Sequence, residues 1–177
     1  IMTEIEEKLF KQYDDSNDLL KFAEAKNVGL IAFNVGVIIG MTTLLVDFKD
    51  DGWIYIIVFG YIMVLNLISI IIAFMSIVPQ IKHKASDLKT YKTDNLLFFG
   101  QIASTKPDEY LQAFVNRYAI KSEHPAYEQD LARQTVIVSQ IALRKMNYFK
   151  VACLITLTGI GTPLALIAYL IFSDPNK

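Results

Sequence analysis

The densest group of side chains that could bind a ligand lies in the middle of the chain. Residues 95–103 read Asn-Leu-Leu-Phe-Phe-Gly-Gln-Ile-Ala, and a tyrosine follows at position 110. Aromatic rings can stack on a nucleobase, amides can meet the polar edges of the base, and basic side chains can meet a phosphate. The candidate nucleotide-binding residues are therefore Lys92, Asn95, Phe98, Phe99, Gln101, Tyr110 and Arg117.

The same segment also has a purely structural interpretation. The run 96–99 is apolar, and such a run can pack neighbouring helices together as a hydrophobic plug. Residue types alone favour the plug over the pocket, and the pocket stays open as the alternative.

No catalytic residue and no metal site is predicted. The single cysteine, Cys153, cannot form an internal disulfide, and His83 and His124 lie too far apart in sequence for a paired ligand motif. The sequence has no nucleophile elbow and no glycine loop for a phosphate. The net charge of -1 provides no basic field for duplex DNA. We therefore expect a protein that is not an enzyme, has no cofactor and does not bind DNA.

Three long apolar runs must position these residues. They cover 28–46, 54–78 and 151–172, and none contains a charged side chain. A bilayer core of about 30 Å requires roughly 20 apolar residues in a helix. A soluble core is the alternative, but a chain of 177 residues is too short to wrap three such helices in protein. The sequence predicts an all-α membrane protein with three transmembrane helices and a cytosolic helical module between the second and third.

The charge distribution predicts the topology. The loop 47–53 holds three aspartates and one lysine, whereas Lys82, Lys84, Arg144 and Lys145 lie close to span ends. Cytoplasmic loops carry the excess of basic residues. We therefore expect a multi-pass protein of the bacterial inner membrane with a cytosolic N-terminus. The predicted regions are a cytosolic N-terminal helix (1–27), a transmembrane hairpin (28–78), a cytosolic sensor or interaction module (79–150), and a third span with a short outer tail (151–177).

Local signals predict the soluble ends of the helices. Thr3 followed by Glu6 is typical of a helix N-terminus. No proline or glycine follows before Gly29, so this helix is expected to continue into the first span. Pro107 predicts a further helix start, and a last long helix is expected from Pro125 into the third span.

Three residues of the spans are predicted to mediate helix association. The amide of Asn66 would face another helix rather than lipid, and Gly159 and Gly161 would let backbones approach closely. Three thin spans cannot enclose an aqueous path, so a pore would have to be shared between copies. We therefore expect a homo-oligomer.

The order of these features resembles the small transmembrane effectors of Pycsar antiphage systems, the PycTM family, over nearly the whole chain. The matching segments are Phe22-Ala23-Glu24-Ala25-Lys26 before the first span, Pro79 after the second, residues 97–103 with Tyr110 downstream, and Gln140-Ile141-Ala142 with Lys145 before the last span. The resemblance implies an effector that is activated by a cyclic mononucleotide, of the pyrimidine type, made by a partner cyclase. Such an effector then impairs the integrity of the inner membrane. The two-span SLATT defence effectors are similar in layout and give a second resemblance.

A function of another class stays open. The chain would then be a membrane scaffold or accessory subunit whose cytosolic helices bind a protein partner. Binding of a cyclic nucleotide by the purified protein would separate the two hypotheses.

Overall fold

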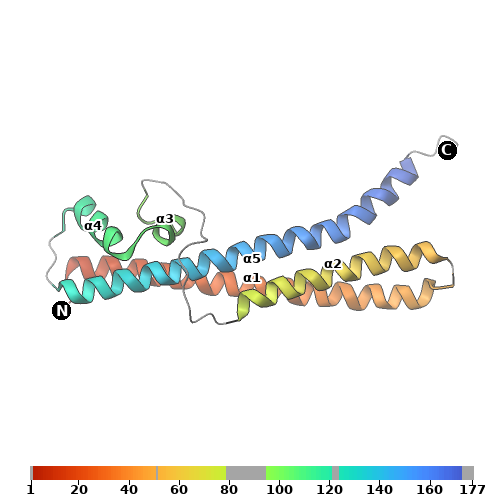
Figure 1. Cartoon of the computed structure of the whole chain (residues 1–177), viewed down its shortest axis with the longest axis horizontal. Helices are drawn as coiled ribbons and strands as arrows, with labels where there is room; N and C mark the ends of the chain where they lie inside the picture. The colour runs from red at the N-terminus through yellow and green to blue at the C-terminus, as the bar shows by residue number, and fades with distance from the viewer. Residues whose placement is uncertain (1, 51, 79–94, 121–123, 173–177) are drawn as a thin grey trace. The chain divides into compact units, whose positions relative to one another are not determined.

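Every element of the chain that the structure describes is an α-helix. The computed structural model describes residues 2–50, 52–78, 95–120 and 124–172. The helices are α1 (Glu4–Phe48), α2 (Trp53–Ile77), α3 (Phe99–Ser104), α4 (Pro107–Tyr118) and α5 (Pro125–Phe172) (Figure 1). The predicted all-α class is confirmed. Pro79, Lys82, His83, Lys84 and the candidate residue Lys92 lie outside the described residues.

The chain forms two compact units. The module comprises Ile1–Ala25 and Pro79–Asn147, and the span unit comprises Lys26–Val78 and Tyr148–Lys177. α1 and α5 therefore supply residues to both units, while α3 and α4 belong to the module and α2 belongs to the span unit. The N-terminal helix, which the sequence suggested as a region of its own, lies in the same compact unit as the segment that follows the second span.

The N-terminus of α1 is fixed by a reciprocal pair of hydrogen bonds. The Thr3 backbone N–H donates to Glu6 Oε2 at 2.8 Å, and the Glu6 backbone N–H donates to Thr3 Oγ1 at 3.4 Å. This is the capping box expected of Thr-x-x-Glu, in which two otherwise free amides are satisfied. The predicted helix start is therefore confirmed, as is the uninterrupted course of α1 over 45 residues.

The connection from α1 to α2 depends on a glycine. Gly52 immediately precedes α2 with φ 143° and ψ 152°. A side chain at this φ would clash with the backbone, whereas glycine adopts it readily. In the span unit α2 therefore turns back alongside the later part of α1 (Figure 1).

The core of the module is apolar and draws on every helix of that unit. Its members are Ile5 and Leu9 of α1, Leu96, Ile102 of α3, Tyr110 and Phe114 of α4, and Leu131, Ala132 and Val136 of α5. Burial of such side chains stabilises each by about 1.5–3 kcal/mol. The short helices α3 and α4 thus pack on the N-terminal parts of α1 and α5 (Figure 1).

Among the described residues, three helices are long and apolar enough to cross a membrane: α1, α2 and α5 up to Ala165. Large apolar side chains of the span unit, among them Phe33, Ile57, Leu67 and Leu157, are exposed on its surface. Soluble proteins rarely expose so much apolar surface, and lipid is the environment that suits it. The predicted three-span membrane protein is confirmed.

Candidate functional site

Two side-chain amides hold the segment 95–104 of the module. Gln12 Nε2 of α1 donates to the Leu97 carbonyl oxygen at 3.4 Å. Gln140 Nε2 of α5 donates to the Ala103 carbonyl oxygen at 3.1 Å. These two helices therefore fix both ends of the segment 95–104, which carries four of the seven candidate ligand residues.

Buried hydroxyl groups join α1 and α5 within the module. Ser139 Oγ donates to Ser16 Oγ at 3.0 Å, and Ser16 Oγ donates to the Gln12 carbonyl oxygen at 2.9 Å. Thr135, one turn before Ser139, is also fully buried and donates to the carbonyl oxygen four residues earlier. The module thus contains a polar seam as well as an apolar core.

Four candidate residues gather on the short segment around α3. The Phe98 and Phe99 rings lie 4.9 Å apart, centroid to centroid, with their planes at 57°, and both side chains are half-buried. Asn95 Oδ1 accepts from the Leu97 backbone N–H at 3.0 Å, and Gln101 Nε2 donates to a threonine hydroxyl one turn later. Their role in binding a nucleotide stays a prediction.

The other described candidates lie on α4. Tyr110 is fully buried in the apolar core, and within the described structure its hydroxyl has no hydrogen-bond partner. Burial raises the pKa of the Tyr110 hydroxyl well above its usual range, and the nearby Tyr118 adds to this effect. Arg117 lies in the last turn of α4 with an exposed side chain. Tyr110 therefore packs in the core, while Arg117 faces solvent.

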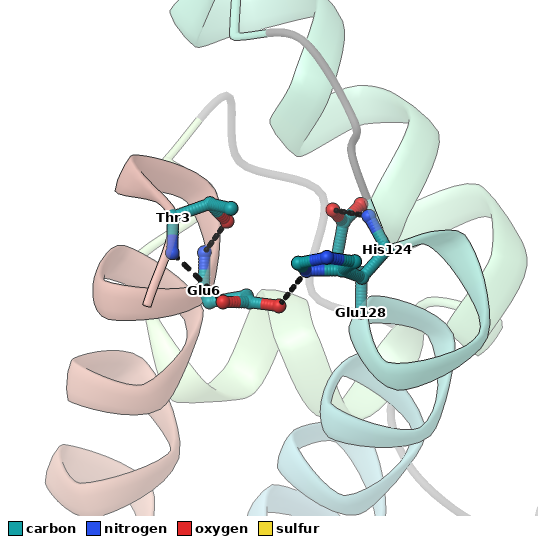
Figure 2. A network of polar contacts seen from close by, with 4 residues as sticks. All are labelled: Thr3, Glu6, His124 and Glu128. Atoms are coloured by element: carbon teal, nitrogen blue, oxygen red, sulfur yellow. Dashed lines mark hydrogen bonds and ion pairs between the residues drawn. The ribbon is translucent and has the colours of Figure 1, made fainter. Parts of the chain in front are cut away.

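A polar network links the start of α1 to the start of α5 (Figure 2). His124 Nδ1 lies 2.8 Å from Glu6 Oε1, and Glu128 Oε1 accepts from the His124 backbone N–H at 3.1 Å. The Thr3 backbone hydrogen bond, followed by the bond to His124, lowers the pKa of the Glu6 carboxyl below its ordinary value of 4.5. The folded module therefore favours the Glu6 carboxylate.

A nearly buried cation lies at the other end of the module. Lys145 Nζ is 2.8 Å from Glu24 Oε1, and the two side chains are 10% and 48% exposed. An amine this deep requires a partner, because desolvation of a charge is costly. The pair joins α5 to α1 shortly before both helices enter the span unit.

In the span unit, three hydroxyl and amide groups from three helices form one network. Asn34 Nδ2 of α1 donates to Ser69 Oγ of α2 at 2.9 Å. Thr156 Oγ1 of α5 lies 3.0 Å from Asn34 Oδ1 and 2.8 Å from Ser69 Oγ. Ser69 Oγ also donates to the Ala152 carbonyl oxygen at 2.8 Å. All four residues are buried, so the three spans are joined by hydrogen bonds in their interior.

The residues predicted to mediate helix association have different environments. Asn66 is fully buried, donates to the Ile62 carbonyl oxygen at 2.8 Å, and lies beside Gly159 of α5. A Cβ atom added at Gly159 would lie 3.0 Å from Leu65 Cβ, so this glycine permits the close approach of α2 and α5. Gly161 is exposed, with nothing within 4 Å of an added Cβ. Association between copies through these residues stays a prediction.

A protein-family model described as the Pycsar effector protein domain, PycTM, matches residues 8–172. The chain belongs to the Pycsar effector family. This confirms the first of the two family resemblances noted from the sequence.

Two curated Pycsar effectors are similar to the chain over most of its length. The Pycsar effector protein RsPycTM of a Rhizobium species is 35% identical over 153 residues, which cover 81% of this chain and 83% of the relative. The Pycsar effector protein PtPycTM of Propioniciclava tarda is 26% identical over 148 residues, covering 81% and 69%. No solved structure gives a significant match. This Pycsar effector is thus a multi-pass membrane protein and a membrane effector of antiphage defence.

Sequence reasoning missed several polar contacts of this Pycsar effector. Glu6 and His124 are 118 positions apart, and Ser16 and Ser139 are 123 apart, so no local pattern connects them. Asn34 of the first span was not among the predicted residues, which included only Asn66 as a polar residue of the spans. The available signal was periodic, since Asn27 and Asn34 are seven residues apart and therefore lie on one face of α1.

Proposed function

We propose that this Pycsar effector is activated by a cyclic mononucleotide and then impairs the integrity of the bacterial inner membrane. The observation that carries the proposal is the family match over 8–172, which includes most of the module and all three spans. The all-helical membrane architecture and the family together favour an effector without enzymatic activity. A pyrimidine nucleotide is the ligand that the family resemblance implies.

We propose that the module binds the nucleotide. The segment 95–104 supports this choice because it combines two half-buried aromatic rings, Phe98 and Phe99, with the amides of Asn95 and Gln101. Aromatic rings offer stacking surfaces and amides offer base-edge contacts. Exposed Arg117 supplies a guanidinium group suited to a phosphate.

Nucleotide binding is tested with the purified full-length protein in detergent. Cyclic CMP and cyclic UMP are titrated against it, with cyclic AMP as the purine control. Phe99→Ala and Arg117→Ala should each weaken binding by roughly tenfold, because each removes one stacking or charge-assisted contact. Phe10→Ala and Arg133→Ala, which change exposed residues of α1 and α5, are the matched controls. If Arg117→Ala binds as wild type does, Arg117 is a surface charge and the phosphate site lies elsewhere.

The proposed topology places the N-terminus and the module in the cytosol, where a cyclase product accumulates. It rests on the basic residues near the module ends of the spans and the acidic loop between α1 and α2. In a Cys153→Ser background, cysteine is introduced at exposed Lys49 or at exposed Arg133, and intact spheroplasts are labelled from outside. Labelling at position 49 alone supports the proposal. Labelling at position 133 alone reverses the orientation.

We propose self-association as the arrangement of the active effector, because three spans of one chain are too few to enclose an aqueous path. Chemical crosslinking in lipid, with and without the activating nucleotide, tests this. A species that remains monomeric under both conditions would rule out a shared pore.

The second candidate function is that of an accessory subunit that binds a protein. It is favoured by exposed apolar side chains on the module, including Phe10, Phe22, Leu97 and Tyr127. Under this function the purified protein would bind none of the three cyclic nucleotides and would instead bind a protein partner.

A further inference from the structure

The interior of the span unit carries a row of polar side chains along α2. The residues that α2 buries are Ile62, Asn66, Ser69, Ala73 and Ser76. The polar members share one helix face because their spacings of three and seven residues are close to whole turns. From Asn66 to Ser76 the row is roughly 15 Å long, about half of a hydrocarbon core.

The other two spans face this row with polar groups of their own. Asn34 of α1 and Thr156 of α5 bond to Ser69 at its centre. α1 and α2 are antiparallel neighbours, so buried Asn27, two turns before Asn34, lies toward the same end of the unit as Ser76, two turns after Ser69. The polar row therefore involves all three helices.

Part of the row is not satisfied by the protein. Among the described residues, no hydrogen-bond partner reaches Asn66 Oδ1 or Ser76 Oγ, although Asn66 is 0% and Ser76 4% exposed. Buried polar groups without a partner are costly, above all where no water is at hand. Apolar residues would pack these positions at no such cost. Polar side chains inside membrane spans either bond neighbouring helices together or line the paths of water and ions.

The row ends at an apolar residue. On the far side of Asn66 from Ser69, the next buried residue of α2 is Ile62, and no further residue of α2 is buried between it and the helix start. Beyond Asn66 the polar row of α2 thus gives way to the aliphatic side chain of Ile62, which offers water and ions no polar contact.

We propose that Asn34, Asn66, Ser69, Ser76 and Thr156, here called the polar lane, become part of the wall of a path that is shared between copies, and that water and small monovalent ions cross the membrane along this path when the effector is active. This inference rests on the proposed function, and it specifies the lining and the permeant class. The lane consists of neutral amides and hydroxyls, and the three apolar runs contain no charged residue. It therefore hydrates small ions without a ring of charge and gives no passage to large solutes.

The test uses full-length protein in vesicles of phosphatidylethanolamine and phosphatidylglycerol that contain potassium and a large trapped dye. Cyclic CMP or cyclic UMP is added, and the release of each solute is followed. Wild type should lose potassium and retain the dye. Thr156→Val and Ser76→Ala should each slow potassium efflux by about tenfold, because each replaces a hydrating hydroxyl with a methyl or hydrogen.

The matched control is Thr158→Val. Thr158 donates to the Leu154 carbonyl oxygen at 2.8 Å, much as Thr156 bonds to Ala152, but its side chain is exposed on the outer surface of α5. Potassium efflux through the Thr158→Val variant should equal that through wild type. Thr156→Val also breaks a network, so thermal unfolding in detergent accompanies each assay. Ser76→Ala removes a hydroxyl that has no partner among the described residues, so its unfolding temperature should be at or above that of wild type.

The possible outcomes separate the lane from the proposed function. If wild type conducts and both lane variants conduct equally well, the lane is a packing feature and the inference is wrong. If the dye escapes together with potassium, the effector disrupts lipid instead and the inference is again wrong. If no cyclic nucleotide triggers any release, the proposed function fails first, and the inference falls with it.

Discussion

Replacement of Tyr110 by phenylalanine should stabilise the module. Tyr110 is 0% exposed, and in the described part of the chain its hydroxyl has no hydrogen-bond partner. A hydroxyl left unpaired in a core destabilises the fold by about 1–3 kcal/mol. The van der Waals contacts of its oxygen atom return only about a few tenths of a kcal/mol. Tyr110→Phe should therefore stabilise the module by about 1 kcal/mol, roughly fivefold in its opening equilibrium.

Amide hydrogen exchange of α4 in lipid nanodiscs measures this directly. The slowest amides near Phe114, which packs against Tyr110 at 5.9 Å between ring centroids, should exchange about fivefold more slowly in the variant. Tyr118→Phe is the control, since Tyr118 is 37% exposed and its hydroxyl can reach water, and it should change exchange little. Faster exchange in Tyr110→Phe would mean that the hydroxyl has a partner in the folded protein, and the reasoning would be refuted.

Three further changes test other contacts. Gly159→Ala should lower stability in detergent by about 1–2 kcal/mol because its Cβ would crowd α2 at 3.0 Å, while Gly161→Ala, at an open position, should be neutral or slightly stabilising. Glu24→Gln should destabilise the module more than Lys145→Met, because only Glu24→Gln leaves the nearly buried ammonium group of Lys145 without its carboxylate. Chemical denaturation of the two variants side by side measures the difference. The lowered pKa of the Glu6 carboxyl means that the ionised side chain stabilises the folded module above pH 4.5, and that this stabilisation is lost as the pH falls through the folded-state pKa. Glu6→Gln should therefore flatten the acid limb of a curve of stability against pH. An unchanged acid limb would contradict this reasoning.

The helices and spans were predictable because their signals are local. Thr3 and Glu6 mark the start of α1 within four residues, and Pro107 stands at the first helical position of α4. The three spans could be predicted by comparing the length of each apolar run with the thickness of the bilayer. Fold class therefore followed from composition along the chain, without any knowledge of which helices touch.

The site was less predictable because it depends on partners far apart in sequence. Asn95, Phe98, Phe99 and Gln101 could be named as a group since they are nearly consecutive. The burial of Tyr110 could not, because it depends on residues of α1 and α5 that complete the same core. The pairing of Glu6 with His124 likewise could not be predicted without the fold, because in the sequence each residue resembles an ordinary polar surface residue.

The two compact units are not separable stretches of sequence. The module is assembled from Ile1–Ala25 and Pro79–Asn147, with the hairpin of the first two spans encoded between these pieces. Transfer of one continuous stretch of the gene therefore cannot move the whole module to another membrane anchor. Diversification of the module would therefore have to proceed by substitution within the existing framework rather than by exchange of a cassette. An isolated soluble version would require a redesigned link from residue 25 to residue 79.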